Sequence, residues 1–376
     1  MSDVPGIDPE RAEIREEFRQ SVRGVLKQAA ARGPRPVWAA ETVDPSAYEQ
    51  AAGLGWLGLL VDEEWGGAGA GLLEAVVVAE ELGAHLTVMP FLSSAVLGCT
   101  AVSVGGDAAA RERWLPGLAA GRLRSAALLT GRSGRLGPEL LDVEATGDGE
   151  DTVLRGEAGF VLDGEDADLL VVAARRAGRA EPELYAVPGG TPGVETTELL
   201  GVDRTHRLSG VVFRDVRVDA SARLPRGADA FPAMLDRAAL VLAADALGVA
   251  RRALDMAVEY AKQREQFGRP IGSFQAIKHK LADMYVLVQG ASVAVDGAAA
   301  ALDEGRDARR LVAVASSYAR DAATKVAGDA IQVHGGIGYT WEHDCHRLFK
   351  RAKFDELYLG DPSVQRERLA RLLLDG

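Results

Sequence analysis

Two stretches decide how this chain folds: Arg264–Gly272, which reads REQFGRPIG, and Gln332–Thr340, which reads QVHGGIGYT. Each follows a long segment whose composition predicts a helix. Arg264 ends the first helix, and Gly335 and Gly336 follow the second as glycines that stop a helix do. A helix stop explains one glycine of the run HGGIG but not all three. The second stretch is therefore expected to do more than end a helix.

Around these stretches the composition changes twice along the chain. Up to about Gly121 it is rich in Ala, Leu and Glu, which favours helices. From about Leu123 to Ala228, short Val and Leu runs lie between Gly, Asp and Pro, which favours short antiparallel strands. From Phe231 to Leu374 the pattern is helical again. We therefore expect an α+β protein with three domains, at 1–122, 123–228 and 229–376.

The expected elements can be placed more closely. Helices are expected near Pro9–Arg32, Pro45–Gly53, Gly71–Leu82, Ala108–Leu115, Phe231–Gln263, Phe274–Glu304, Ala308–Val333 and Pro362–Leu374. Strands are expected at Thr152–Leu154, Leu169–Ala173, Leu184–Val187 and Gly210–Val216.

Charge and cysteine content exclude several classes of function. The formal net charge is −12 and the sequence pI is about 5.1, which argues against binding nucleic acid because phosphate contacts need a basic face. Cys99 and Cys345 form no CxxC pair, and His279, His343 and His346 show no metal-ligand spacing, so no metal site is expected. The sequence contains no apolar run of ~18 residues, so no membrane span is expected. Met1–Glu10 is acidic and lacks the basic-then-apolar order of a signal peptide. With two cysteines that form no recognisable motif, a reducing cytoplasm is the expected setting.

Together the two stretches resemble the C-terminal half of the acyl-CoA dehydrogenases. That family removes an α-proton and a β-hydride from an acyl-CoA thioester, using a glutamate base and FAD. The N-terminal third agrees, because Gly55–Leu59 reads GWLGL, Glu63–Gly69 reads EEWGGAG and Glu80–Gly83 reads EELG at familiar spacing. The resemblance implies an N-terminal helical domain, a middle β-domain of antiparallel strands and a C-terminal four-helix bundle.

The resemblance also implies which residues of the first stretch hold FAD. Arg264 would cross a subunit interface to the pyrophosphate of the neighbour's FAD, a group that a planar and permanently charged guanidinium suits. Taken alone, Arg264 would be only a solvated basic helix end. Phe267 would pack beside the flavin, and Gln275 would offer its amide near the adenosine half. Gln266 is in register with the same motif.

In the second stretch, Gln332, Val333, Gly335 and Gly336 would let backbone approach the FAD adenosine. His334 is a possible base by its side chain alone, but its position favours a packed residue beside the loop. In the middle domain the family's flavin-ring segments are altered. Thr130 is retained, whereas Leu162 stands where the family has a threonine.

The family's catalytic glutamate is missing from both of its known places. One place reads Leu359 and the other reads Ala238, and neither side chain accepts a proton. Asp361 and Asp245 are weak substitutes. Asp361 precedes Pro362 in a pattern typical of a helix N-cap, and Asp245 lies inside a predicted helix.

Three functions fit this sequence. The first is an FAD-dependent acyl-CoA dehydrogenase subunit that lacks the base and works in a heterotetramer with a glutamate-bearing relative, as in bacterial steroid-degrading members of the family. The second is a homo-oligomeric flavoenzyme with a substitute base or other chemistry. The third is a structural subunit without flavin. The sequence does not identify the acyl group or the electron acceptor.

Overall fold

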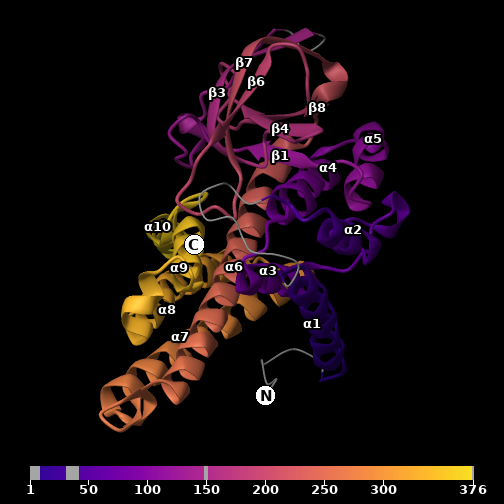
Figure 1. Ribbon diagram of the computed structural model, residues 1–376. Coiled ribbons are helices and arrows are strands. Elements are labelled where there is room, and N and C mark those ends of the chain that lie inside the picture. Colours follow the sequence, from indigo (N-terminus) through magenta and orange to yellow (C-terminus); the bar gives the residue numbers. More distant parts are fainter. Residues whose placement is uncertain (1–8, 31–41, 148–150, 375–376) are drawn as a thin grey trace. The chain divides into compact units, whose positions relative to one another are not determined.

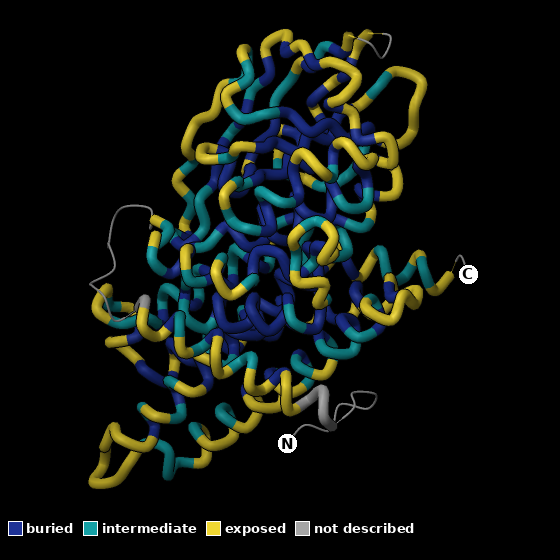
Figure 2. The backbone as a smooth tube through the Cα atoms, turned by 90° about the vertical axis from the view of Figure 1, so that its right-hand side faces the viewer, coloured by how far each residue is buried: buried dark blue, intermediate teal, exposed yellow. Residues whose placement is uncertain are grey.

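The computed structural model describes residues 9–30, 42–147 and 151–374 (Figure 1). The chain divides into two compact units. The helical unit comprises Met1–Trp38, Val76–Thr87 and Ala239–Gly376, and the sheet unit comprises Ala39–Ala75 and Val88–Ala238. Exposed residues lie mainly in the connections and on outer helix faces, while buried residues fill the interiors (Figure 2).

The helical unit is organised around one alanine-rich helix. α8 (Arg309–His334) contacts α7 (Gln275–Asp303), α9 (Cys345–Leu357) and α10 (Pro362–Leu374). Small side chains such as Ala319 and Ala323 are buried on α8, so neighbouring helices can approach it closely. The unit also holds α1 (Pro9–Ala30) and most of α3 (Leu72–His85) and α6 (Gly227–Gln263).

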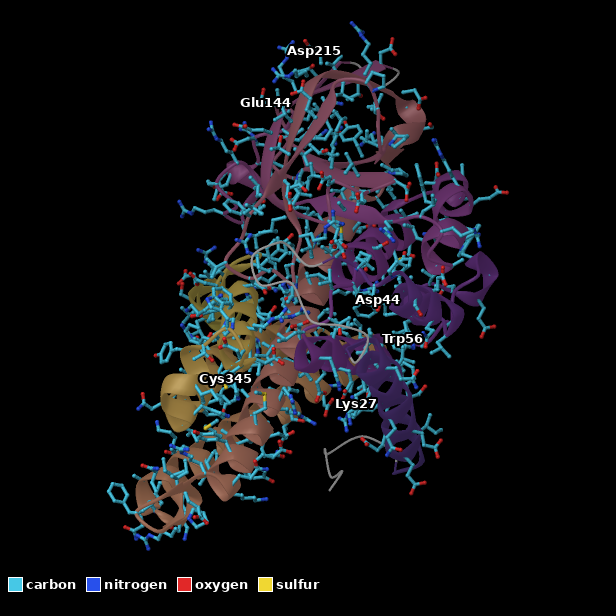
Figure 3. All side chains as sticks on the ribbon, viewed as in Figure 1. Lys27, Asp44, Trp56, Glu144, Asp215 and Cys345 are labelled. Atoms are coloured by element: carbon cyan, nitrogen blue, oxygen red, sulfur yellow. The ribbon has the colours of Figure 1, made fainter. Side chains whose placement is uncertain are left out.

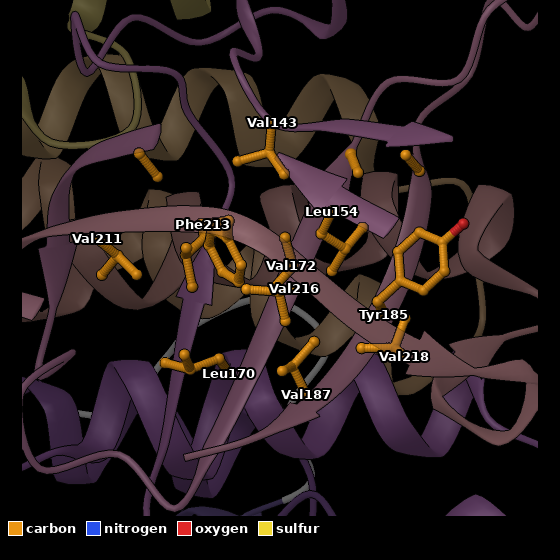
Figure 4. Close-up of a cluster of buried hydrophobic side chains, with 14 of the residues drawn as sticks. Val143, Leu154, Leu170, Val172, Tyr185, Val187, Val211, Phe213, Val216 and Val218 are labelled. Carbon is orange, nitrogen blue, oxygen red and sulfur yellow. The ribbon is translucent and has the colours of Figure 1, made fainter. Parts of the chain in front are cut away.

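The sheet unit contains two four-stranded sheets. One has the strand order β1-β4-β5-β8 and the other the order β2-β3-β7-β6. The strands span Ser125–Leu128 (β1), Glu144–Gly147 (β2), Asp151–Leu162 (β3), Leu169–Ala174 (β4), Glu183–Pro188 (β5), Val194–Leu199 (β6), Leu208–Asp219 (β7) and Arg223–Leu224 (β8). Leu154, Val172, Tyr185 and Phe213 belong to the apolar core of this unit (Figure 4).

Helices α2 (Pro45–Gly53), α4 (Cys99–Gly105) and α5 (Ala108–Ala119) complete the sheet unit. A π-helix, Phe91–Gly98, leads directly into α4, and all of its residues are buried. Asp44 caps α2, because its side chain accepts hydrogen bonds from the amides of Ser46 and Ala47 at 2.9 and 3.0 Å.

The α+β class and the order helical, β, helical are confirmed, and α2 and α10 have the expected bounds. The middle domain of mainly antiparallel strands is confirmed as well, and two details of its strands differ from expectation. β1 pairs parallel to β4, and β3 and β7 are long strands of 12 residues each, with register shifts where the pairing is irregular. Residues 31–32 of the first expected helix, and most of Met1–Glu10, lie outside the described residues.

Contrary to expectation, α7 is long and apolar enough to cross a membrane by length and composition: its most apolar 18-residue window has a mean hydropathy of 1.4. However, α7 packs on α8 and buries residues such as Met284, Val288 and Val295. Apolar side chains on both of its faces account for the hydropathy, which the sequence pattern alone did not reveal.

A buried ion pair ties α6 to α9 within the helical unit. Asp245 accepts two hydrogen bonds from Arg351, from Nε at 2.8 Å and from Nη2 at 2.5 Å. Arg351 also donates to the carbonyl oxygen of Thr87, which follows α3. A Cβ added to Gly83 of α3 would lie 2.2 Å from the backbone oxygen of Asp245, so α3 and α6 are in close contact. Both partners of the pair are buried.

We predict that Asp245→Ala lowers the free energy of unfolding by about 3–5 kcal/mol, because it leaves the Arg351 guanidinium buried without its carboxylate. Urea unfolding followed by helical circular dichroism measures this loss. The control is Asp321→Ala, which breaks the exposed pair with Arg366 in the same unit and should cost at most about 1 kcal/mol. Equal effects of the two substitutions would show that the buried pair has no special importance.

Candidate functional site

A hairpin that follows α6 displays the first of the two stretches at the surface. β9 (Glu265–Gln266) pairs antiparallel with β10 (Arg269–Pro270), which leaves Phe267 and Gly268 as a two-residue loop. Their φ angles are 54° and 76°, and positive values at both positions are typical of a type I′ turn. The Phe267 side chain is 91% exposed. An apolar ring this exposed is suited to contact with another molecule or subunit.

Arg264 stands at the base of this hairpin. Its backbone is fixed, because its amide donates to Tyr260 and its carbonyl accepts from Ile271, both at 2.8 Å. Its guanidinium is exposed and forms no ion pair or hydrogen bond with any residue that the structure describes. A permanently charged group held on a rigid helix end is thus available to an anion from outside this unit.

The glycines of the second stretch have three different physical roles. Gly335 has φ 63° and ends α8, a conformation that L side chains rarely adopt. Gly338 is packed, since a Cβ there would lie 3.0 Å from the carbonyl oxygen of Ile331. Gly336 has no positive φ, and a Cβ there would meet nothing within 4 Å. The unit itself does not require a glycine at 336, so this position leaves space for an outside group to approach the backbone.

One aromatic contact brings the two stretches together. The ring of Tyr260, four residues before Arg264, stacks on the ring of His334 with a centroid distance of 4.5 Å. His334 is buried, and burial lowers its pKa. Its Nδ1 lies 2.8 Å from the carbonyl oxygen of Ala330. His334 is thus a packed residue that joins the ends of α6 and α8.

The remaining predicted residues of the helical unit divide by exposure. Gln266, Gln275 and Gln332 are exposed. The Gln266 amide donates to the Glu265 carbonyl at 2.8 Å. Val333 is only 5% exposed, so its side chain belongs to the core and only its backbone could contact a ligand.

In the sheet unit, Thr130 is directed inward. It is 7% exposed, and its hydroxyl lies 3.3 Å from the carbonyl oxygen of Gly159, to which it donates. Leu162, which replaces the family's threonine, is buried as well. Thr130 therefore joins the two segments that contact the flavin ring in the family, and within this unit its hydroxyl is already used.

Both places of the family's glutamate are apolar and closed. Leu359 is 7% exposed, and Ala238 is completely buried. Leu359 also has φ 51°, which is uncommon for a bulky side chain.

A buried arginine that the sequence did not single out fixes the backbone beside Leu359. Arg320, in α8, donates to the carbonyl oxygens of Glu356 and Tyr358 at 3.0 and 2.7 Å. Burial lowers its pKa to about 10. Arg320 thus satisfies carbonyls at the end of α9, the groups that a helix leaves without partners of its own.

Neither substitute carboxylate is placed as a base. Asp245 is held by Arg351 in the buried pair described above. Asp361 caps α10 by accepting hydrogen bonds from the amides of Ser363 and Val364 at 2.7 and 3.1 Å. The Ser363 hydroxyl donates a further hydrogen bond to Asp361. This bond is the main cause, together with the two amide bonds, of a lowered pKa of Asp361. A carboxylate stabilised in its charged form is a weaker proton acceptor.

The structure also gathers residues that sequence spacing did not connect. His334, His343 and Cys345 each place a potential ligand atom within 4.8 Å of the others. Cys345 is labelled in Figure 3. The three positions span the turn between α8 and α9, and only the fold of that turn brings them together.

Comparison with known proteins agrees with this fold. Residues 225–374 match the C-terminal domain of acyl-CoA dehydrogenase, and residues 12–122 match its N-terminal domain. Acyl-CoA dehydrogenase IpdE2 of Mycolicibacterium smegmatis is 33% identical to this chain over 95% of this chain and 98% of its own length.

Two solved structures of complexes are also similar. The ChsE4–ChsE5 complex from Mycobacterium tuberculosis contains a chain with 30% identity and a TM-score of 0.85, which covers 96% of this chain and 97% of that one. A variant of the Tcur3481–Tcur3483 steroid ACAD gives 30% identity and a TM-score of 0.86, over 97% and 98% of the two chains. The chain therefore belongs to the acyl-CoA dehydrogenase family of oxidoreductases, and its relatives include steroid-type members.

Proposed function

We propose that this chain is the FAD-contacting subunit of a heteromeric acyl-CoA dehydrogenase whose catalytic glutamate comes from a related partner chain. The main support is an asymmetry. The outward-facing residues that suit FAD are present and exposed, at Arg264, Phe267 and Gly336, whereas both places for the base are apolar and buried, at Leu359 and Ala238.

The residues present fit a dinucleotide. Arg264 would bind the pyrophosphate, Phe267 would cover an apolar part of the cofactor, and the open backbone at Gly335 and Gly336 would contact the adenosine. Gln275 and Gln332 would add amide hydrogen bonds. FAD, when bound, would accept the hydride from the acyl β-carbon. Thr130 would support the ring-facing segments from within, because its hydroxyl donates to Gly159.

The proposed assembly has a surface available for it in the helical unit. An apolar face on α7 and α8 exposes Tyr285, Val286, Val293, Leu311, Val314 and Tyr318. Burying such a face against another subunit would be favourable, and this explains the hydropathy of α7 without a membrane. We further propose three domains, at 1–122, 123–228 and 229–376, a cytoplasmic location and an acyl-CoA substrate.

We predict that Arg264→Ala weakens FAD retention at least ten-fold and leaves the fold intact. A charge-assisted contact to phosphate contributes about 1.5–3 kcal/mol, and the free guanidinium has no role inside its own unit. Flavin absorbance after dialysis gives the measurement, and circular dichroism verifies folding. Lys262→Ala, which removes an exposed cation from the end of α6, is the matched control. Equal flavin loss in both variants, or no flavin in the assembly that the unaltered protein forms with a glutamate-bearing relative, would contradict the proposal.

The two adjacent glycines give a second test. Gly336→Ala should reduce FAD affinity without changing stability, because a methyl group there meets nothing inside the unit but obstructs the bound cofactor. Gly335→Ala should lower stability by about 1–3 kcal/mol as well, because φ is positive at that position. Urea unfolding and flavin titration of the two variants separate these effects. Unchanged flavin affinity in Gly336→Ala would count against an adenosine contact there.

Activity of the lone chain tests the missing base. General base catalysis contributes typically about 10²–10⁴-fold, so the chain alone should show little or no acyl-CoA dehydrogenation with an artificial electron acceptor. Turnover should appear when a glutamate-bearing relative is co-expressed. Robust turnover by the lone chain, abolished by Asp361→Asn or Asp245→Asn, would instead establish a homomeric enzyme with a substitute base.

A further inference from the structure

We propose that His334, His343 and Cys345 form a binding site for a zinc-type divalent cation. Their potential ligand atoms all lie within 4.8 Å of one another. The Cys345 sulfur is 3.4 Å from Nδ1 of His334. The rings of His334 and His343 lie side by side, with a centroid distance of 4.5 Å. The fold of the turn between α8 and α9 thus brings the three potential ligands together.

The distances suit zinc. Zinc is bound by cysteine sulfur at about 2.3 Å and by histidine nitrogen at about 2.0–2.1 Å, usually in a tetrahedron. Two such ligands on a tetrahedron are then about 3.5 Å apart, close to the observed separation of the Cys345 sulfur and His334 Nδ1. His343, whose ligand atom lies within 4.8 Å of the other two, would complete three corners by moving inward, and water could take the fourth. One thiolate with two imidazoles favours zinc over magnesium or calcium, which prefer oxygen ligands.

The surroundings of the cluster would hold its ligands in place. His334 and Cys345 are buried, at 4% and 1% exposure. Tyr260 stacks against the His334 ring and fixes its plane. Nδ1 of His334 could leave the Ala330 carbonyl at little cost, because that oxygen lies within α8 and can keep its helical hydrogen bond. Binding would displace the thiol proton of Cys345 to solvent, while both imidazoles bind in neutral form.

A charged cavity in the helical unit is lined in part by sequence neighbours of the cluster. The cavity has a volume of about 880 Å³, and its lining includes Glu342 and Asp344, the sequence neighbours of His343. These carboxylates would favour the approach of a cation. Arg252 and Arg347 also line the cavity and oppose it, although Arg347 lies 3.9 Å from a carboxylate oxygen of Asp344. Since His343 is only half-buried, it is the ligand through which a cation would enter.

Bound metal would connect the two ends of the glycine loop, the segment Gly335–Tyr339 that follows α8. The segment Gly335–Tyr339 lies between His334 and His343, so coordination at both residues would clamp the backbone at Gly336. Stabilisation of this loop would then change FAD affinity. That coupling rests on the proposed function, whereas the metal site itself does not.

Cobalt(II) is the probe for this site, because a thiolate ligand gives it a charge-transfer band and tetrahedral geometry gives it intense visible bands. We expect untagged protein to bind Co²⁺ with one site per chain, to show both features and to release Co²⁺ to added Zn²⁺. Cys345→Ser should abolish the charge-transfer band and weaken Zn²⁺ binding at least ten-fold. Cys99→Ser, which removes the other buried cysteine, should bind like the unaltered protein.

His343→Asn provides a second variant at a less buried position, in case Cys345→Ser does not fold. It should keep the thiolate band but weaken Zn²⁺ binding at least ten-fold, and it should lose the rise in melting temperature that Zn²⁺ gives the unaltered protein. Absence of the thiolate band in the unaltered protein would overturn the proposal. So would a band that persists in Cys345→Ser or disappears in Cys99→Ser. These outcomes do not depend on flavin, so they are separate from a failure of the proposed function.

Discussion

The buried pair between Asp245 and Arg351 is the interaction on which the helical unit depends. It joins α6 to α9, and the third contact of Arg351, to the carbonyl of Thr87, adds the end of α3. α9 is the helix that separates the glycine loop from the segment containing Leu359. Fixing α9 therefore fixes both the loop Gly335–Tyr339 and the place at Leu359 where the family keeps its base. The same pair removes Asp245 from the set of available proton acceptors.

Arg320 extends this arrangement to the far end of α9. Its guanidinium is buried under the carbonyls of Glu356 and Tyr358, next to Leu359. The buried side chain of Leu359 thus stands where the family keeps its carboxylate. The helical unit combines exposed residues at Arg264, Phe267 and Gly336 with a buried apolar residue, Leu359, at one of the places where the family keeps its base. This combination agrees with the similarity of the chain to solved structures of complexes between unlike chains.

Much of this fold could be predicted from the sequence, because long helices carry periodic apolar residues and clear ends. Pro45–Gly53 and Pro362–Leu374 have proline at the first helical position after an aspartate, and both were placed correctly. The π-helix Phe91–Gly98 and the parallel pairing of β1 with β4 were not predicted, since a continuous apolar run does not reveal which partner buries it.

Only part of the candidate site could likewise be predicted from the sequence. The two motifs, through their resemblance to the family, singled out Arg264, Phe267 and the loop after α8, and their roles toward a cofactor stay predictions. Local patterns do not predict contacts between residues distant in sequence. The hydrogen bonds from Arg320 to the end of α9 and the ion pair of Asp245 with Arg351 are two such contacts. The grouping of His334 with Cys345 was also missed, because spacing along the chain does not show how the intervening turn folds back.

Native mass spectrometry of this chain co-expressed with a glutamate-bearing relative tests the central claim most directly. The account predicts an assembly of both chains in equal number that retains FAD, with a single cofactor shared by each unlike pair. It also predicts that Arg264→Ala in this chain empties that assembly of flavin while both chains stay bound. A homomer of this chain alone, with FAD in every subunit and no association with the relative, would contradict it.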